Sequence, residues 1–119
     1  MSEPINIKSS MRDGIPEIDV EEVYKNLPTL CLIDVRRPEE FDGELGHIDG
    51  ASLITLGPDL ETFIETFKNP DELVVFICRS GSRSGTATLM AQEFGLKKVF
   101  NMTGGMIRWN DFQLPVVRN

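Results

Sequence analysis

The feature that most constrains this chain is an apolar run, residues 73–77, that ends on a cysteine and passes into a short polar loop. The run, Leu-Val-Val-Phe-Ile, is typical of a strand buried on both faces. The loop, residues 78–83, has the sequence Cys-Arg-Ser-Gly-Ser-Arg, and a helix-compatible segment follows it. Because open α/β sheets bind ligands beyond the carboxyl ends of their strands, this order predicts Cys78 at a ligand-binding edge.

The rest of the chain alternates short apolar runs with helix-compatible segments, the order that builds a parallel sheet covered on both faces. Strands are predicted near Ile18 and over 30–35, 51–54, 73–77 and 98–101, and helices over about 20–27, 38–41, 58–67 and 85–94, with a last helix opening at 104–105. Asp19, with Glu22 three residues later, matches a capping box at the first helix. The expected architecture is one α/β domain.

The domain is predicted to span residues 15–119, because residues 1–14 show little periodicity and are expected to form an N-terminal tail. With 119 residues, 40% of them hydrophobic, the chain can bury one real core. It has no apolar stretch of membrane-spanning length, and its first residues lack the basic start and apolar core of a signal peptide. These features predict a cytoplasmic location.

Charge and cysteine content narrow the function further. A formal net charge of −7 argues against nucleic acid and anionic membranes as main partners. The two cysteines, Cys31 and Cys78, do not make a disulfide framework, and with the single histidine they show no metal-ligand spacing. Cys31 lies inside the apolar run 30–33 and is predicted to be a small buried residue. No metal ion is expected.

Cys78 is the predicted nucleophile. A thiol above backbone N–H groups at a helix N-terminus, with arginines beside it, is favoured as the thiolate. A tight loop turns several N–H groups inward and forms an anion nest. The residues predicted to hold an anionic substrate, here called the anion cradle, are Arg79, Ser80, Gly81, Ser82 and Arg83. The site therefore predicts chemistry on sulfur or phosphate.

Three further polar residues are assigned supporting roles. Asp34 ends a predicted buried strand, where a lone carboxylate needs partners, and Arg36 follows two residues later. Asp34 could act as a general base, but an anchoring ion pair, with Arg36 or with the 78–83 loop, is favoured. His47, within the segment Gly-His-Ile-Asp-Gly-Ala at 46–51, is expected to hold a loop in place rather than take part in the reaction.

These motifs together resemble a single-domain rhodanese-like protein of the thiosulfate/persulfide sulfurtransferase family. The resemblance covers about residues 15–117. The segments that carry it are Asp34-Val35-Arg36, Pro38-Glu39-Glu40-Phe41, residues 46–51, residues 78–84, Gly104-Gly105 with Trp109, and Leu114-Pro115-Val116. Asp42-Gly43-Glu44-Leu45 is longer and more acidic than the family pattern at that loop.

The resemblance implies a doubly wound α/β fold around a mainly parallel five-stranded sheet, with helices on both faces. It also implies a reaction in two steps without a metal or cofactor. Cys78 takes a sulfur from thiosulfate or a persulfide donor and then passes it to a thiol acceptor, or to cyanide in the test tube. The implied partners are a small sulfur-containing anion, a thiol and, in some relatives, a protein donor or acceptor.

Other functions remain open. A cysteine phosphatase would have five residues between its cysteine and arginine, whereas four separate Cys78 from Arg83, and a histidine usually precedes the cysteine where this chain has Ile77. Arsenate reduction is a weaker alternative, because it also begins with thiolate attack on an oxyanion. A non-enzymatic regulatory module is disfavoured by the retained loop. A sulfur carrier that passes persulfide between proteins is not separable from a free-standing enzyme by sequence.

Overall fold

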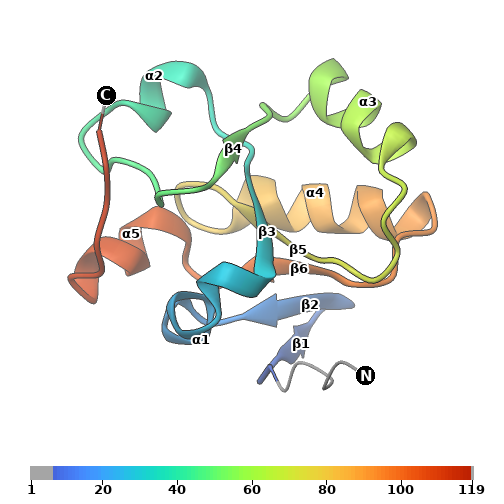
Figure 1. Ribbon diagram of the computed structural model, residues 1–119, viewed down its shortest axis with the longest axis horizontal. Coiled ribbons are helices and arrows are strands. Elements are labelled where there is room, and N and C mark those ends of the chain that lie inside the picture. The colour runs from blue at the N-terminus through green and yellow to red at the C-terminus, as the bar shows by residue number, and fades with distance from the viewer. Residues whose placement is uncertain (1–6, 119) are drawn as a thin grey trace.

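The computed structural model describes residues 7–118 and shows a six-stranded sheet with helices on both faces (Figure 1). The strands are β1 (Ser10–Arg12), β2 (Ile15–Ile18), β3 (Leu30–Asp34), β4 (Ser52–Leu53), β5 (Leu73–Ile77) and β6 (Val99–Met102). The helices are α1 (Val20–Lys25), α2 (Pro38–Phe41), α3 (Pro58–Thr66), α4 (Ser82–Glu93) and α5 (Gly105–Asp111), with a 3₁₀ turn, η1 (Leu27–Thr29). The strand order is β1-β2-β6-β5-β3-β4, so the most apolar strand, β5, lies inside the sheet.

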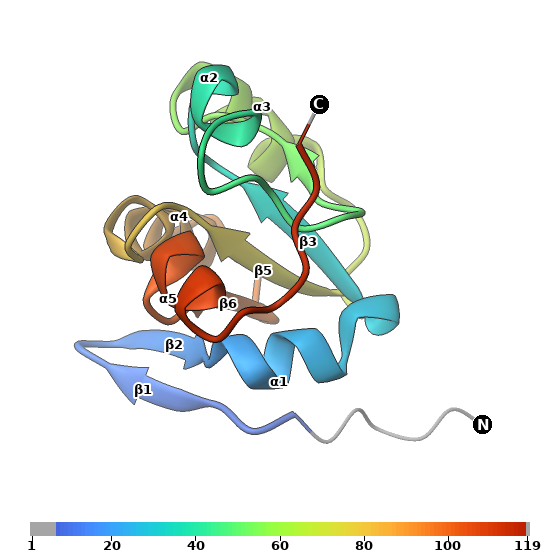
Figure 2. The same ribbon diagram turned by 90° about the vertical axis from the view of Figure 1, so that its left-hand side faces the viewer.

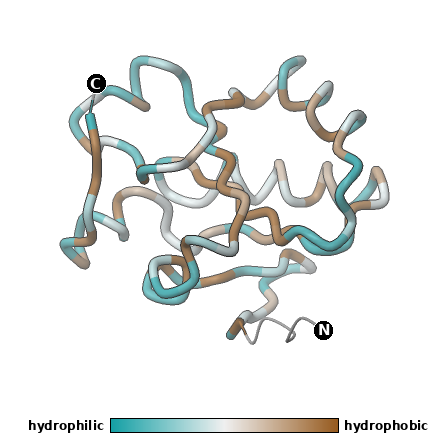
Figure 3. The backbone as a smooth tube through the Cα atoms, viewed as in Figure 1, coloured by the Kyte–Doolittle hydropathy of each residue, from teal (hydrophilic) through white to brown (hydrophobic). Residues whose placement is uncertain are grey.

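Strand β5 divides its side chains between two hydrophobic clusters. Val75 and Ile77 face the cluster that packs on α1 and α5, whereas Val74 and Phe76 face the cluster that packs on α3 and α4. Since successive strand residues point to opposite faces, a continuous apolar run is what a doubly covered strand requires. The predicted doubly wound α/β fold is therefore confirmed. Figure 3 shows the hydrophobic colour along β3 and β5 and hydrophilic residues at many bends.

The N-terminal boundary of the domain departs from the prediction. Residues 10–12, predicted as part of a tail, form β1, which pairs antiparallel with β2 and raises the strand number from five to six. The connecting turn has positive φ at both Asp13 and Gly14, as a tight hairpin turn requires. The two strands and their turn stand out at one edge of the domain in Figure 2. Residues 1–6 of the predicted tail lie outside the described residues.

Two helix N-termini also differ from the sequence-based expectation, α1 in its cap and α4 in its first residue. Asp19 is the N-cap of α1, but its side chain makes no capping hydrogen bond. Its carboxylate instead accepts a hydrogen bond from Arg108 Nε at 2.6 Å and so ties α1 to α5, because an ion pair is the stronger partner. Helix α4 begins at Ser82 rather than near 85, which places Arg83 and Ser84 in its first turn.

The C-terminal segment returns across the domain and ends beside α2 (Figures 1 and 2). Val117 and His47 exchange two backbone hydrogen bonds of 2.9 Å, an isolated antiparallel bridge. Trp109 in α5 is fully buried and donates through its indole N–H to the Pro115 carbonyl at 2.9 Å. The segment therefore closes the face of the sheet that α1 and α5 cover.

Candidate active site

Cys78 follows β5 directly, at the carboxyl end of the sheet, and is 1% exposed. Its Sγ accepts a hydrogen bond from the Gly81 N–H at 3.0 Å, and the Ser84 hydroxyl oxygen lies 3.2 Å from the same sulfur. Both neighbours come from the turn that leads into α4. A hydrogen-bond donor aimed at a sulfur stabilises negative charge that develops on it, and the Gly81 N–H is such a donor.

The first turn of α5 holds the 78–83 loop from behind. The Met106 N–H donates to the Cys78 carbonyl at 2.9 Å, and the Ile107 N–H donates to the Arg79 carbonyl at 3.0 Å. Because a trans peptide points its N–H opposite to its C=O, the N–H groups of Arg79 and Ser80 are turned away from α5. Docking on α5 thus orients the donors of the anion cradle.

Glycine is required where these segments meet. A Cβ on Gly105 would lie 2.5 Å from the carbonyl oxygens of Cys78 and Arg79, and Gly105 has φ +59°. Gly81, at φ +101°, caps α4, and its Cβ would lie 3.3 Å from the Gly104 nitrogen. Both contacts need a residue that tolerates positive φ and close backbone approach. The Gly104-Gly105 motif therefore fits the active loop directly onto α5.

The other cradle residues lie at the rim. Arg79, Ser80 and Ser82 are exposed, and no ion pair involves Arg79 among residues 7–118. Gly81 is buried and is the only one of the five whose N–H contacts the Cys78 sulfur. The roles assigned to these five residues in binding substrate stay predictions, but Arg79 presents its charge to solvent beside the loop.

Arg83 differs from Arg79 because it is already paired. Its guanidinium donates to both oxygens of Glu40 in α2, at 2.8 and 2.9 Å. The hydrogen bonds from Arg83 lower the pKa of Glu40 to about 2, and the hydrogen bond to Glu40 raises the pKa of Arg83. The pattern Pro38-Glu39-Glu40-Phe41 predicted a short helix but gave no sign that Glu40 would reach the active loop.

Asp34 and Arg36 form a buried ion pair, the arrangement favoured for them by the sequence. Asp34 is fully buried and accepts from Arg36 Nε at 2.9 Å and from Nη2 at 2.8 Å. Arg36 also donates to the carbonyls of Glu40, at 3.2 Å, and Gly46, at 2.8 Å. The pair therefore ties β3 to the segment between α2 and β4, from which Glu40 reaches Arg83.

His47 is placed away from the sulfur and against the same segment. It is 5% exposed, its ring stacks on Phe41 with centroids 3.6 Å apart, and Nδ1 lies 2.8 Å from the Phe41 carbonyl oxygen. The backbone bridge to Val117 also fixes the main chain at this residue. The geometry gives His47 the supporting position that the sequence predicted.

A chain of hydrogen bonds between buried polar side chains lies behind the cysteine and was not predicted from the sequence. Ser84 Oγ lies 2.5 Å from Asn101 Oδ1, and Asn101 Nδ2 donates to Glu17 at 2.9 Å. Arg12 closes the chain with a 3.0 Å ion pair to Glu17. Ser84 belongs to the motif that carries the family resemblance, but Asn101 and Glu17 are brought to it only by the pairing of β2 with β6.

Cys31 has a different environment from Cys78. It is half-buried, and burial together with the nearby carboxylate of Glu72 raises the pKa of its thiol to about 11. No hydrogen-bond donor to its sulfur occurs within the described part of the chain. Cys31 therefore stays protonated at neutral pH. The sequence predicted a buried residue, whereas the structure leaves Cys31 half-buried on β3.

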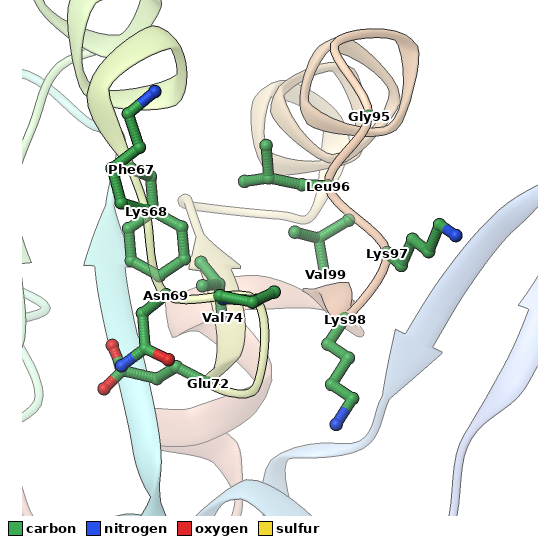
Figure 4. Close-up of a pocket in the computed structure, with 11 residues that line it drawn as sticks. Phe67, Lys68, Asn69, Glu72, Val74, Gly95, Leu96, Lys97, Lys98 and Val99 are labelled. Carbon is green, nitrogen blue, oxygen red and sulfur yellow. The ribbon is translucent and has the colours of Figure 1, made fainter.

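The cavity drawn in Figure 4 lies at the opposite end of the sheet from Cys78. It measures about 420 Å³ and is lined by Phe67, Lys68, Asn69, Pro70, Glu72, Val74, Gly95, Leu96, Lys97, Lys98 and Val99. A second cavity of about 510 Å³ lies beside the active loop, between Arg12 of β1, Ser82 and Leu89 of α4, and Thr103. Only the second cavity borders residues of the anion cradle.

Two features are absent from residues 7–118. No helix there is both long and apolar enough to cross a bilayer. No group of three or more His, Cys, Asp or Glu side chains gathers there with the geometry of a metal site.

Comparison with known proteins identifies the family. The model of the rhodanese-like domain matches residues 19–112. The chain belongs to the rhodanese-like family. The matched region runs from Asp19, the N-cap of α1, to the residue after α5 and includes Cys78, the loop and Glu40. The resemblance drawn from the motifs is therefore confirmed.

Relatives and solved structures agree with this assignment. A Bacillus subtilis protein named “Putative sulfur carrier protein YrkF” is 36% identical over 85% of this chain and 54% of its own length, so this chain spans about half of that relative. “Thiosulfate sulfurtransferase 18” of Arabidopsis thaliana is 30% identical over 98% of this chain and 93% of its own. The solved polysulfide-sulfur transferase homodimer of Wolinella succinogenes has a TM-score of 0.71 at 28% identity, covering 87% of this chain and 78% of that one. The names of these three relatives all refer to the transfer or carriage of sulfur.

Proposed function

We propose that this rhodanese-like protein is a sulfurtransferase that moves a sulfane sulfur from thiosulfate or a persulfide donor to a thiol acceptor through a Cys78 persulfide. The observation that carries the proposal is the Cys78 sulfur held 3.0 Å from the Gly81 N–H, at the base of a loop fixed by α5. Cys78 is 1% exposed, which favours attack on a narrow terminal sulfur over attack on a tetrahedral phosphate.

In the first half-reaction, the Cys78 thiolate attacks the outer sulfur of thiosulfate. A bond forms between the two sulfurs as the S–S bond within thiosulfate breaks, and its electron pair leaves with sulfite. With a persulfide donor, the leaving group is the donor thiolate. The product is a Cys78 persulfide whose charge lies on the terminal sulfur, where preorganised N–H donors stabilise it.

In the second half-reaction, an acceptor thiolate attacks the terminal sulfur of the persulfide. The electron pair of the broken S–S bond returns to Cys78, which becomes a thiolate again, and the acceptor carries away the persulfide. Cyanide would take the same sulfur and leave as thiocyanate. Atoms and electrons balance in both steps without a redox cofactor.

The loop rim supplies the cations for an anionic donor. Arg79 is exposed and has no ion pair within residues 7–118, so it is placed to meet an incoming sulfonate or carboxylate. Arg83 can contribute only where the donor competes with Glu40. The donor therefore contacts Arg79 first, and Arg83 sets how tightly it is held.

A sulfur carrier with protein donors and acceptors is the second candidate. The naming of the Bacillus relative as a sulfur carrier protein favours it. Both candidates use the same Cys78 persulfide and differ in the donor they accept. Saturable turnover with thiosulfate supports the free-standing enzyme, whereas transfer from a protein persulfide alone supports the carrier.

The test of the proposal is thiocyanate formation from thiosulfate and cyanide by three proteins. Wild type and Cys31→Ser should turn over at similar rates, because Cys31 is unreactive at neutral pH. Cys78→Ser should lose turnover while keeping its thermal unfolding midpoint within a few degrees. Residual turnover by the folded Cys78→Ser protein would overturn the assignment of the nucleophile.

A further inference from the structure

A continuous chain of buried polar side chains runs from the N-terminal hairpin to the sulfur of Cys78. Glu17 is 5% exposed, and Asn101 and Ser84 are fully buried. Glu17 and Asn101 are register partners on β2 and β6, and Ser84 lies in the first turn of α4. Buried polar groups of this kind persist where each finds partners, so their hydrogen bonds can be followed atom by atom.

The amide of Asn101 can face only one way. Its Nδ2 donates to Glu17 Oε2 at 2.9 Å and to the Gly81 carbonyl at 3.1 Å. A carboxylate and a carbonyl only accept, so turning the amide over would place three acceptor oxygens together. The Glu17 carboxylate therefore holds Asn101 with Oδ1 directed at Ser84.

The Ser84 hydroxyl then has two neighbours and one hydrogen. Its oxygen lies 2.5 Å from Asn101 Oδ1 and 3.2 Å from the Cys78 sulfur. Because Oδ1 carries no hydrogen, the short contact needs the Ser84 hydrogen between the two oxygens. A thiolate at Cys78 would need that same hydrogen, so Asn101 and the sulfur compete for it.

We propose that Glu17 controls the reactivity of Cys78 by holding Asn101 so that it draws the Ser84 hydrogen away from the sulfur. Glu17 and Asn101 act as positioning residues, since neither is hydrogen-bonded to the sulfur. The ion pair from Arg12 to Glu17, with Arg12 57% exposed, continues the chain to the surface of the hairpin. Under this proposal the N-terminal hairpin is part of the active site. The proposal deepens the proposed function and rests on it.

The test measures alkylation of Cys78 by iodoacetamide across pH, which requires no sulfur donor and so stands apart from the test of sulfur transfer. All proteins carry Cys31→Ser, so that Cys78 is the one cysteine that iodoacetamide can alkylate. In Glu17→Gln the new amide can donate as well as accept, so it no longer fixes Asn101 in one orientation, and a turned Asn101 frees the Ser84 hydrogen for the sulfur. The alkylation rate at pH 7 should rise by about three- to tenfold, which is the change that one added hydrogen bond to the thiolate produces. The pH profile of alkylation should move to lower pH. Ser84→Ala should leave alkylation near the wild-type rate, because in the wild type the Ser84 hydrogen goes to Asn101 and not to the sulfur.

The double variant decides whether the effect passes through Ser84. In the Ser84→Ala background, Glu17→Gln should leave the alkylation rate unchanged, and Ser84→Thr, which keeps a hydroxyl, should restore the response. An equal effect of Glu17→Gln in both backgrounds would show a charge acting through space and overturn the proposal. The other charged pairs near the loop, Arg83 with Glu40 and Arg36 with Asp34, are untouched in these variants.

A control variant covers the case in which Ser84→Ala does not fold. Glu21→Gln removes an exposed carboxylate from α1 and should leave alkylation unchanged. Glu17→Gln and Glu21→Gln are then compared at equal folded fraction, checked by circular dichroism. No difference between them would overturn the proposal without any change at Ser84.

Discussion

Arg83 and Glu40 form a two-point ion pair between the active loop and α2, with Nη1–Oε1 at 2.8 Å and Nη2–Oε2 at 2.9 Å. The pair joins the first turn of α4 to α2, 43 residues earlier in the chain. Arg83, which the sequence assigned to the anion cradle, therefore already holds a carboxylate of the protein itself. Under the proposed function, an anionic sulfur donor either uses Arg79 or displaces Glu40.

Glu40→Gln should therefore lower the KM for thiosulfate by about three- to tenfold with little change in kcat, because Arg83 becomes available to the donor. Arg83→Ala should raise the KM by a similar factor. Glu39→Gln is the matched control, since Glu39 is an exposed carboxylate on the same helix. Steady-state kinetics with thiosulfate and cyanide gives both constants, and an unchanged KM in Glu40→Gln would show that Arg83 does not meet the donor.

The same ion pair makes stability depend on pH. Folding lowers the pKa of Glu40 from 4.5 to about 2, so the stabilisation is fully present above about pH 4.5 and is lost as the pH falls toward 2. Glu40→Gln should cost about 1 kcal/mol at pH 7, the scale of a partly exposed pair, and nothing near pH 2. Urea unfolding at pH 7, 4.5 and 2.5 measures both proteins. A difference between them that is constant across this range would rule out the pair as its source.

Gly105→Ala should disturb the active loop. The added Cβ would lie 2.5 Å from the carbonyl oxygens of Cys78 and Arg79, at a backbone position with φ +59°. We expect a loss of about 1–3 kcal/mol in unfolding free energy and a loss of sulfur transfer beyond that expected from unfolding. Gly95→Ala also places a side chain at positive φ, +108°, but with no atom within 4 Å, and should lose stability only. Equal activity loss in the two variants would contradict docking of the loop on α5.

The two cysteines should differ in reactivity. The pKa of Cys31 is raised to about 11, so at pH 8 nearly all of it is the unreactive thiol. Alkylation of the native protein followed by peptide mapping should label Cys78 first, and unfolding in urea should expose both. Labelling of Cys31 as fast as that of Cys78 in the native protein would show that the environment of the Cys31 thiol is more polar than the one in the structure.

The fold and the position of Cys78 at the carboxyl end of β5 followed from the sequence because their signals are local. An apolar run that ends on Cys78, with Gly81 in the following turn, is readable without knowledge of tertiary contacts. The hairpin of β1 was missed although Asp13-Gly14 is a turn signal, because the flanking residues show no alternation of apolar and polar side chains.

The polar partners of the site could not be found in the same way. Glu40 reaches Arg83 across 43 residues, and Glu17 reaches Asn101 across 84 residues through strand pairing. Asp19 shows the same limit, since it was expected to cap α1 and instead pairs with Arg108. A side chain with several possible partners is assigned by the tertiary structure, which periodicity and spacing do not give.

The most direct test of the account is the intact mass of the protein after thiosulfate treatment, and again after addition of cyanide. The account predicts a gain of one sulfur atom, mapped to Cys78 and absent in Cys78→Ser, that cyanide removes. A protein persulfide donor, tried in parallel, should load the same residue. An unchanged mass with both donors would contradict a Cys78 persulfide and with it the proposed sulfur transfer.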